Sequence, residues 1–176
     1  GAFGTLIPFE HWQRFETRIR RNTEAALELL DRHDATATFF ASGWLGEQHP
    51  EILRLVADSG HEVACQGFYQ QSVRELAPGA FREDLRRSRS AVEQATGRRI
   101  NGFRIGRGWI GPADFWVLDV LAAEGFAWDA SMLPRGRQCR EHRECFRVHR
   151  RETASGPITE VPASALDVAG FALPFS

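Results

Sequence analysis

Short apolar runs alternate with longer amphipathic stretches along most of this chain, and that alternation constrains the fold more than any other feature. The short runs are rich in apolar residues and bounded by turn residues, which is typical of buried strands. They are Ala37–Ala41, His61–Cys65, Ile100–Arg104, Phe126–Trp128 and Ile158–Val161. The longer stretches space their apolar residues as amphipathic helices do. They are Trp12–Leu30, Leu45–Ala57, Pro78–Ala95 and Ala113–Glu124.

Strands that alternate with helices in this way indicate an α/β fold, with parallel buried strands and crossover helices. Active sites in such folds lie in the loops that follow the carboxyl ends of the strands. These loops are expected at 42–45, 66–76, 105–112, 129–132 and from Pro162 onward.

The length of 176 residues suits a single domain, 1–176, and the 43% of hydrophobic residues is enough for a sizeable core. Between about 134 and 155 the alternation stops in an Arg-rich stretch. Few apolar residues would anchor that stretch, so we expect a largely irregular, mobile excursion there.

Composition excludes several classes of protein. The net charge of −1 lacks the basic excess of a nucleic-acid-binding domain. All 22 basic residues are arginine, so a Schiff-base or P-loop lysine is excluded. No apolar run is long enough for a membrane span, and no signal peptide opens the chain, which begins at Gly1. The three cysteines leave the compartment open, cytoplasmic or periplasmic.

An ordered series of motifs runs along the chain. The longest runs from Trp116 to Phe126 and leads to Asp129-Ala-Ser131. The shorter motifs are Arg21-Asn-Thr23, Ala37-Thr-Phe-Phe40 with Trp44, Gly60-His-Glu-Val-Ala64, Phe81-Arg-Glu-Asp-Leu85, Thr96-Gly97, Gly102-Phe-Arg104 and Ile158-Thr-Glu-Val-Pro162. In this order and spacing they make the chain resemble the polysaccharide deacetylases, the NodB-homology domain of carbohydrate esterase family four, within their exopolysaccharide-associated bacterial branch. The resemblance implies a distorted (β/α) barrel and a bacterial enzyme of carbohydrate metabolism.

The resemblance also implies a reaction, the hydrolytic removal of N-acetyl groups from a polysaccharide that contains N-acetylated sugars. In the family a divalent metal, usually zinc, activates water and is held by one Asp and two His in a His-x-x-x-His loop. Here that loop reads Cys65-Gln-Gly-Phe-Tyr-Gln70, so the two former metal-ligand positions are Gln66 and Gln70. A neutral amide oxygen is a poor ligand for zinc, and we therefore expect no metal at this place.

The other catalytic elements of the family are also absent or altered. The Asp pair expected after the first strand has no match in residues 1–10, so that strand either lies upstream of residue 1 or has diverged. Arg104 matches the arginine that orients the catalytic base, although a structural salt bridge is an equal alternative for it. The proline two residues later is replaced by Gly106, and the C-terminal Leu-His would lie beyond Ser176.

Four residues of the expected loops are candidates for substrate binding: Tyr69, Arg107, Trp109 and Asp129. Aromatic faces at the mouth of a barrel suit stacking against sugar rings. The alternative for the aromatic residues of these loops is that they fill the top of the barrel.

Cys139, His142, Cys145 and His149 are spaced as Cys-x-x-His-x-x-Cys-x-x-x-His, which leaves three alternatives open. They are a structural zinc site, a Cys139–Cys145 disulfide or free thiols in a loop. Elsewhere, we expect Cys65 to be a core thiol and His61 to be packed and hydrogen-bonded.

Three hypotheses for the function follow. The first is a catalytically degenerate deacetylase-family domain that binds glycan without metal. The second is an active metal-dependent N-deacetylase with atypical ligands. The third is a structural or partner-binding module of a polysaccharide synthesis system. We favour the first because both motif histidines are replaced.

Overall fold

The computed structural model describes residues 16–134, 146–168 and 171–174, and the fold is given for these residues. Six strands form one sheet in the order β1-β2-β3-β4-β6-β5. They are β1 (Thr38–Ala41), β2 (Glu62–Cys65), β3 (Gly102–Phe103), β4 (Trp128–Asp129), β6 (Gly156–Glu160) and β5 (His149–Thr153). The strands from β1 to β6 in this row pair in parallel, and β5 pairs antiparallel with β6.

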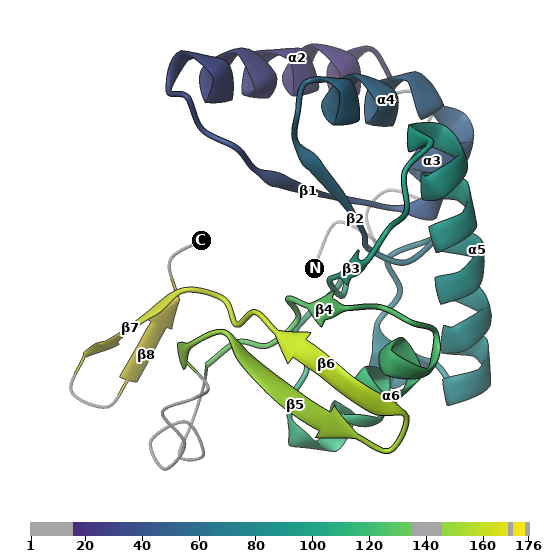
Figure 1. Cartoon of the computed structure of the whole chain (residues 1–176), viewed down its shortest axis with the longest axis vertical. Helices are drawn as coiled ribbons and strands as arrows, with labels where there is room; N and C mark the ends of the chain where they lie inside the picture. Colours follow the sequence, from purple (N-terminus) through teal and green to yellow (C-terminus); the bar gives the residue numbers. More distant parts are fainter. Residues whose placement is uncertain (1–15, 135–145, 169–170, 175–176) are drawn as a thin grey trace.

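Helices cover the outer side of this curved sheet (Figure 1). They are α2 (Glu16–Arg32), α3 (Gly43–Gln48), α4 (Pro50–Asp58), α5 (Pro78–Thr96) and α6 (Trp116–Ala123). Helix α5 packs on α3, α4 and β2, and α6 packs on β6. Two 3₁₀ turns, η2 (Val73–Glu75) and η3 (Pro112–Asp114), lie in the loops after β2 and β3.

The predicted parallel arrangement of the first strands is therefore confirmed. Alternate side chains of β1 show how the sheet separates its two sides. Phe39 packs against the hydrophobic core and contacts the ring of His61, whereas Phe40 contacts the ring of Trp128. The Trp128 ring lies over Gly102, where a Cβ atom would meet it at 1.9 Å. Only glycine leaves room for this ring.

Helix α5 begins and ends where its sequence signals lie. Pro78 occupies the first turn, and Gly97, in the left-handed region with φ of 67°, caps the carboxyl end. The helix buries Phe81, Leu85 and Val92, each worth about 1.5–3 kcal/mol of apolar burial.

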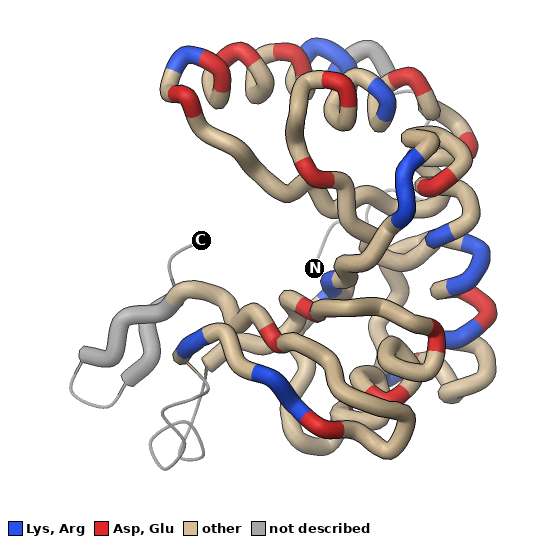
Figure 2. The backbone as a smooth tube through the Cα atoms, in the orientation of Figure 1, with Lys and Arg blue, Asp and Glu red and all other residues tan. Residues whose placement is uncertain are grey.

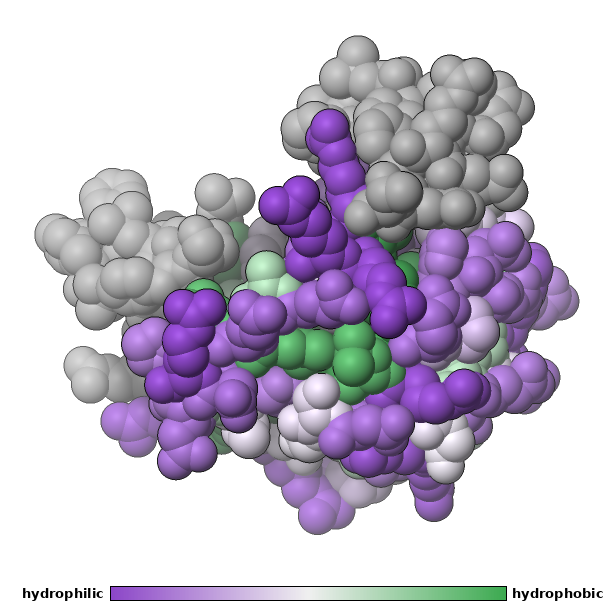
Figure 3. Space-filling model, turned by 90° about the horizontal axis from the view of Figure 1, so that it is seen from above, coloured by the Kyte–Doolittle hydropathy of each residue, from purple (hydrophilic) through white to green (hydrophobic). Residues whose placement is uncertain are grey.

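Figure 2 shows that charged residues follow the helices and β5, while β1 carries none. From above, Figure 3 shows a mostly hydrophilic face with a narrow apolar strip.

One prediction about the elements is wrong. The stretch 45–57 is not one helix, because α3 ends at Gln48 and Pro50 starts α4. The Arg-rich stretch, expected to be largely irregular, contains a strand, because His149–Thr153 forms β5 and pairs along its full length with β6. Its central part, 135–145, lies outside the described residues, as do Cys139, His142 and Cys145.

A small hairpin was not anticipated from the sequence. Strands β7 (Ala165–Val168) and β8 (Phe171–Pro174) pair with each other in a separate two-stranded sheet. Of the helices that the structure describes, none has the length and apolar character needed to cross a membrane.

Candidate functional site

The loop after β2 brings Gln66 and Gln70 face to face. Gln66 extends the strand, because its N–H donates to the carbonyl of Ala41 at 2.9 Å. Gly67 then takes φ of 77° and Gln70 takes φ of 55°, so the chain curls back on itself. Nε2 of Gln70 donates a 2.9 Å hydrogen bond to Oε1 of Gln66. Each amide group therefore satisfies part of the hydrogen-bonding capacity of the other.

Two neighbouring helices hold this loop in place. The first N–H groups of α3 donate to loop carbonyls, Gly43 to Gly67 at 3.0 Å and Trp44 to Phe68 at 3.4 Å. From α5, a carboxylate oxygen of Asp84 accepts the N–H of Phe68 at 2.9 Å. Burial raises the pKa of Asp84, although the backbone donors of the loop partly oppose that rise. The loop is thus fixed by backbone hydrogen bonds.

Arg104 follows β3 and lies beside this loop. Its N–H donates to the carbonyl of Cys65 at 3.0 Å, and its guanidinium lies 4.9 Å from the centre of the Trp109 ring and 5.5 Å from that of Phe40. It forms no ion pair with any acid of the described residues. The structural salt bridge that was an alternative for Arg104 therefore has no partner in that part of the chain.

Asp129, at the end of β4, is 1% exposed and lies within the electrostatic reach of Arg104. Burial raises the pKa of Asp129 to about 7, although hydrogen bonds from Ser131 and the charge of Arg104 oppose the rise. Oγ of Ser131 donates to Asp129 at 2.6 Å and accepts the N–H of Ile105 at 2.8 Å. Ser131 thereby links the loop after β3, at Ile105, to the buried carboxyl group of Asp129 through two hydrogen bonds.

The loop after β3 also touches the glutamine pair directly. A Cβ atom on Gly106 would lie 2.6 Å from Cβ and 2.7 Å from Cγ of Gln70. Only a residue without a side chain permits this approach. The glycine that replaces the family's proline therefore seats Gln70.

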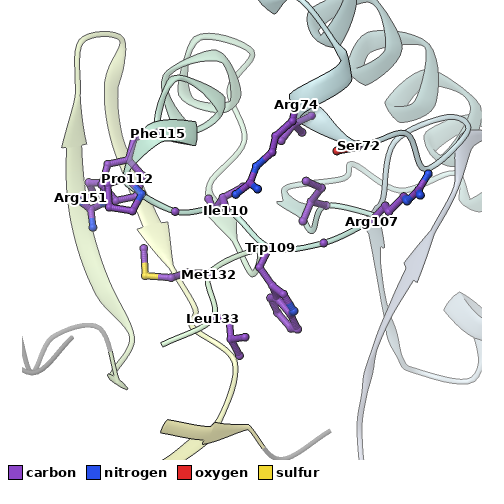
Figure 4. A pocket seen from close by; sticks show the side chains of 14 residues that line it. Ser72, Arg74, Arg107, Trp109, Ile110, Pro112, Phe115, Met132, Leu133 and Arg151 are labelled. Carbon is purple, nitrogen blue, oxygen red and sulfur yellow. The ribbon is translucent and has the colours of Figure 1, made fainter. Parts of the chain in front are cut away.

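A pocket of about 400 Å³ opens between the loops after β2, β3 and β4. Its wall includes Arg107 and Trp109, and its floor includes the buried side chains of Ile110 and Met132 (Figure 4). Arg74, from η2, extends toward Ile110. A second cavity, of about 550 Å³, is lined by Arg104 together with Phe40 and Trp128 of the sheet. Trp109 thus lines the first pocket, and Arg104, which contacts its ring, lines the second cavity.

A buried ionic cluster behind the first pocket was missed at the sequence level. Glu160, at the end of β6, is fully buried and pairs with Arg151 of β5, whose guanidinium lies 4.2 Å from the centre of the Phe115 ring. Nε2 of His149 lies 3.6 Å from the other oxygen of Glu160. The alternation along Ile158–Glu160 is the signal that could have placed Glu160 on the same side as Ile158.

The structure brings most of the predicted site residues together. Gln66 and Gln70 meet each other, Arg107 and Trp109 line one pocket, and Arg104 links that pocket to Asp129. Tyr69 lies apart from them: it packs edge-on against Phe68, near Arg87 of α5, and lines neither hollow.

Two further sequence predictions concern buried residues. Cys65 is fully buried, its Sγ lies 3.1 Å from Oγ of Ser88, and burial raises its pKa to about 11, which confirms a core thiol. His61 is packed as expected, but its buried Nδ1 has no hydrogen-bond partner in the part of the chain that the structure describes, so the hydrogen-bonding prediction is wrong for that atom.

The residues at the glutamine pair do not fit a zinc ion. Their oxygens are neutral amide carbonyls, and one of them already accepts the hydrogen bond from the other glutamine. Across the described residues, no cluster of three or more His, Cys, Asp or Glu could hold a metal.

A curved, mostly parallel sheet with helices outside, and a candidate site at the carboxyl ends of its strands, define the class of (β/α) barrel-like domains. The profile of the polysaccharide deacetylase family matches residues 10–121, so this chain belongs to that family. The motifs from Arg21-Asn-Thr23 to Gly102-Phe-Arg104 lie within this range.

Individual relatives agree. A chitooligosaccharide deacetylase of Bradyrhizobium is 29% identical over 109 residues, 60% of this chain and 46% of the relative. A protein of Mycobacterium smegmatis, assigned to the polysaccharide deacetylases, has a crystal structure that matches with a TM-score of 0.68 and 25% identity, covering 81% of this chain and 45% of that one. The chain spans about half the length of these relatives.

A pseudoenzyme of carbohydrate esterase family 4 from Bacillus anthracis shares the fold. Its TM-score is 0.53 at 22% identity, and the match covers 57% of this chain and 36% of that protein.

Proposed function

We propose that this domain binds an N-acetylated glycan at the mouth of the sheet and does not hydrolyse it. The observation that carries the proposal is the hydrogen-bonded pair Gln66–Gln70. By the family pattern these two positions would carry the metal-binding imidazoles. Two amides that bond to each other offer no strong donor to zinc, and without that metal the water that attacks the N-acetyl group is not activated.

The same side chains suit a neutral sugar. A glutamine amide offers donors and an acceptor, which match hydroxyl and acetamido groups. The Trp109 ring lines the neighbouring pocket and presents an apolar face of the kind that stacks on sugars. In the proposal Arg107 adds polar contacts at the same pocket, and Arg104, which lies against Trp109, orients that ring.

Asp129 enters this proposal as a supporting residue. It is 1% exposed, and Ser131 occupies both of its carboxylate oxygens. We assign to it the positioning of Arg104 rather than contact with the sugar. Tyr69 lies on the adjacent surface, where it would extend the sugar track beyond the glutamine pair.

The fold has a precedent for this use. The Bacillus anthracis neighbour is described as a pseudoenzyme, so the same fold occurs in a protein named for lacking the family's activity.

Calorimetric titration of the full chain with an N-acetylglucosamine hexasaccharide tests the proposal. Binding should be measurable, and Trp109→Ala should weaken it roughly tenfold, the equivalent of one lost stacking contact. Leu29→Ala is the control, because Leu29 is an exposed apolar residue of α2, on the helical side of the sheet.

Acetate release from the same hexasaccharide separates the alternatives. Binding without acetate supports the proposal. Release of acetate that depends on added zinc would support the active deacetylase with atypical ligands, and no binding at all would leave the structural or partner-binding module.

A further inference from the structure

The pocket beside Trp109 has a charge that a neutral glycan does not need. Three of its lining side chains are arginines, Arg74, Arg107 and Arg151, and no carboxylate of the described residues lines it. The floor between them is apolar, with Ile110, Phe115 and Met132. A hollow of about 400 Å³ is large enough for a sugar residue.

The arginines differ in how far their charge is already neutralised. Arg151 pairs with the buried Glu160, and Arg74 bonds Asp114 through one nitrogen at 3.2 Å. Arg74 is 70% exposed and keeps further N–H donors for a ligand. Arg107 is exposed and has no ion-pair partner among the described acids.

The two acids that pair with Arg74 and Arg151 do not line the pocket. Asp114 is 5% exposed, accepts the N–H of Gly111 at 3.1 Å and does not line the hollow. Glu160 is fully buried behind Arg151. A ligand in the pocket therefore meets guanidinium groups and not their carboxylate partners.

The side chains stand at separate places around the opening. In Figure 4 Arg151 lies on one side of Ile110, Arg107 lies on the other, and Arg74 reaches in between. Guanidinium groups arranged in this way can each bind a different carboxylate, since each offers a planar fork of donors. That arrangement suits anionic groups on successive sugar residues.

We propose that the glycan bound by this domain is acidic and that Arg107 and Arg74 bind carboxylates of uronate-type sugar residues in this pocket. The proposal rests on the glycan-binding function proposed above and specifies the class of glycan. In this proposal the Trp109 ring and the apolar floor pack against the face of the sugar ring, and the two arginines bind its carboxylate groups.

Two oligosaccharides of equal length test this proposal on the full chain. A hyaluronan hexasaccharide alternates glucuronate with N-acetylglucosamine, and the N-acetylglucosamine hexasaccharide is neutral. At low salt the acidic probe should bind about tenfold more tightly, the gain expected of one charge-assisted contact. The preference should shrink at roughly 0.5 M salt, where exposed charges are screened.

The variant Arg107→Gln should remove most of the preference, because it should weaken binding of the acidic probe far more than binding of the neutral probe. Arg74→Gln should reduce the preference further; because it also strips Asp114 of its partner, its folding is checked by circular dichroism. Arg54→Gln, on the exposed side of α4, is the charge-matched control and should keep the preference.

The outcomes separate the two proposals. Equal binding of both probes would overturn the acidic-glycan proposal and leave the proposed function standing. A preference that persists in both Arg107→Gln and Arg74→Gln would also overturn it, as would inorganic phosphate that displaces the acidic probe at equal concentration. If neither probe binds, the proposed function itself fails.

Discussion

Nε2 of Gln70 donates a 2.9 Å hydrogen bond to Oε1 of Gln66, four residues earlier in the loop after β2. Gln70 is held in this position from behind by Gly106, which belongs to the loop after β3. Two loops therefore set the geometry of the pair: the loop after β2 carries both glutamines, and the loop after β3 packs against Gln70. This geometry can be tested by changing either glutamine or the glycine.

Adding a methyl group at Gly106 should disturb the pair. In Gly106→Ala the new Cβ atom would lie 2.6 Å from Cβ of Gln70, so the loop has to move. We expect a loss of about 1–3 kcal/mol in the free energy of unfolding, as overpacked sites show. Urea denaturation measures this, and glycan titration should show weaker binding.

The matched control lies in the same loop. Gly111→Ala adds a methyl group that meets nothing within 4 Å, at a φ of −133° that alanine adopts freely. It should change the free energy of unfolding by less than about 0.5 kcal/mol. Similar losses in the two variants would contradict the close approach of Gly106 to Gln70.

Asp129 should make stability depend on pH. Burial raises its pKa from 3.8 to about 7, so the folded state binds the proton more tightly than the unfolded state. The stabilising contribution is complete below pH 3.8 and is lost as the pH rises through about 7. Within that window the free energy of unfolding should fall by up to ~1.4 kcal/mol per pH unit from this group.

The comparison that isolates this effect is Asp129→Asn against the unmodified chain, by urea denaturation at several values of pH. The variant should lose the decline, whereas Asp58→Asn, at an exposed residue of α4, should keep it. An unchanged pH dependence in Asp129→Asn would mean that this carboxyl group is ionised throughout the range.

Arg151 should be essential to stability because its partner is buried. Arg151→Met would leave the fully buried Glu160 without its guanidinium, at a cost of about 3 kcal/mol. Arg150→Met, one residue earlier on the opposite face of β5, breaks only an exposed pair with Glu152 and should cost less than about 1 kcal/mol.

A second variant checks the cause. Replacing Glu160 as well, in Arg151→Met with Glu160→Gln, removes the buried charge and should recover part of the loss. If the double variant is less stable than Arg151→Met, the stability lies in packing of Glu160 rather than in its charge.

The sequence predicted the part of the fold in which apolar pattern and turn residues agree. The strands β1 to β3 and helix α5 belong to this part, because Asp34, Gly60, Pro78 and Gly97 mark their limits. Pro50 was placed inside one helix, although a proline at the first turn serves equally well to start a second one. Strand β5 was missed because its sequence, HRRET, has no apolar face, and only its pairing with β6 makes it a strand.

The candidate site was predicted to a similar extent. Motif spacing brought Gln66, Gln70 and Arg104 into one neighbourhood, since parallel strands end at the same edge of a sheet. Spacing says nothing of side-chain direction, so the separate position of Tyr69 and the role of Ser131 behind Asp129 needed coordinates.

Zinc content tests the central claim most directly. The purified full chain, saturated with zinc and then desalted, is analysed for metal beside Gln66→Ala and Gln70→Gly, a pair in which glycine tolerates the φ of 55° at position 70. Cys139→Ser runs in parallel to report any metal held by the Cys139–His149 sequence cluster. We expect well under one zinc per chain at the glutamine pair, so that neither glutamine variant lowers the metal content. One zinc per chain that is kept in Cys139→Ser and lost in Gln66→Ala or Gln70→Gly would contradict it.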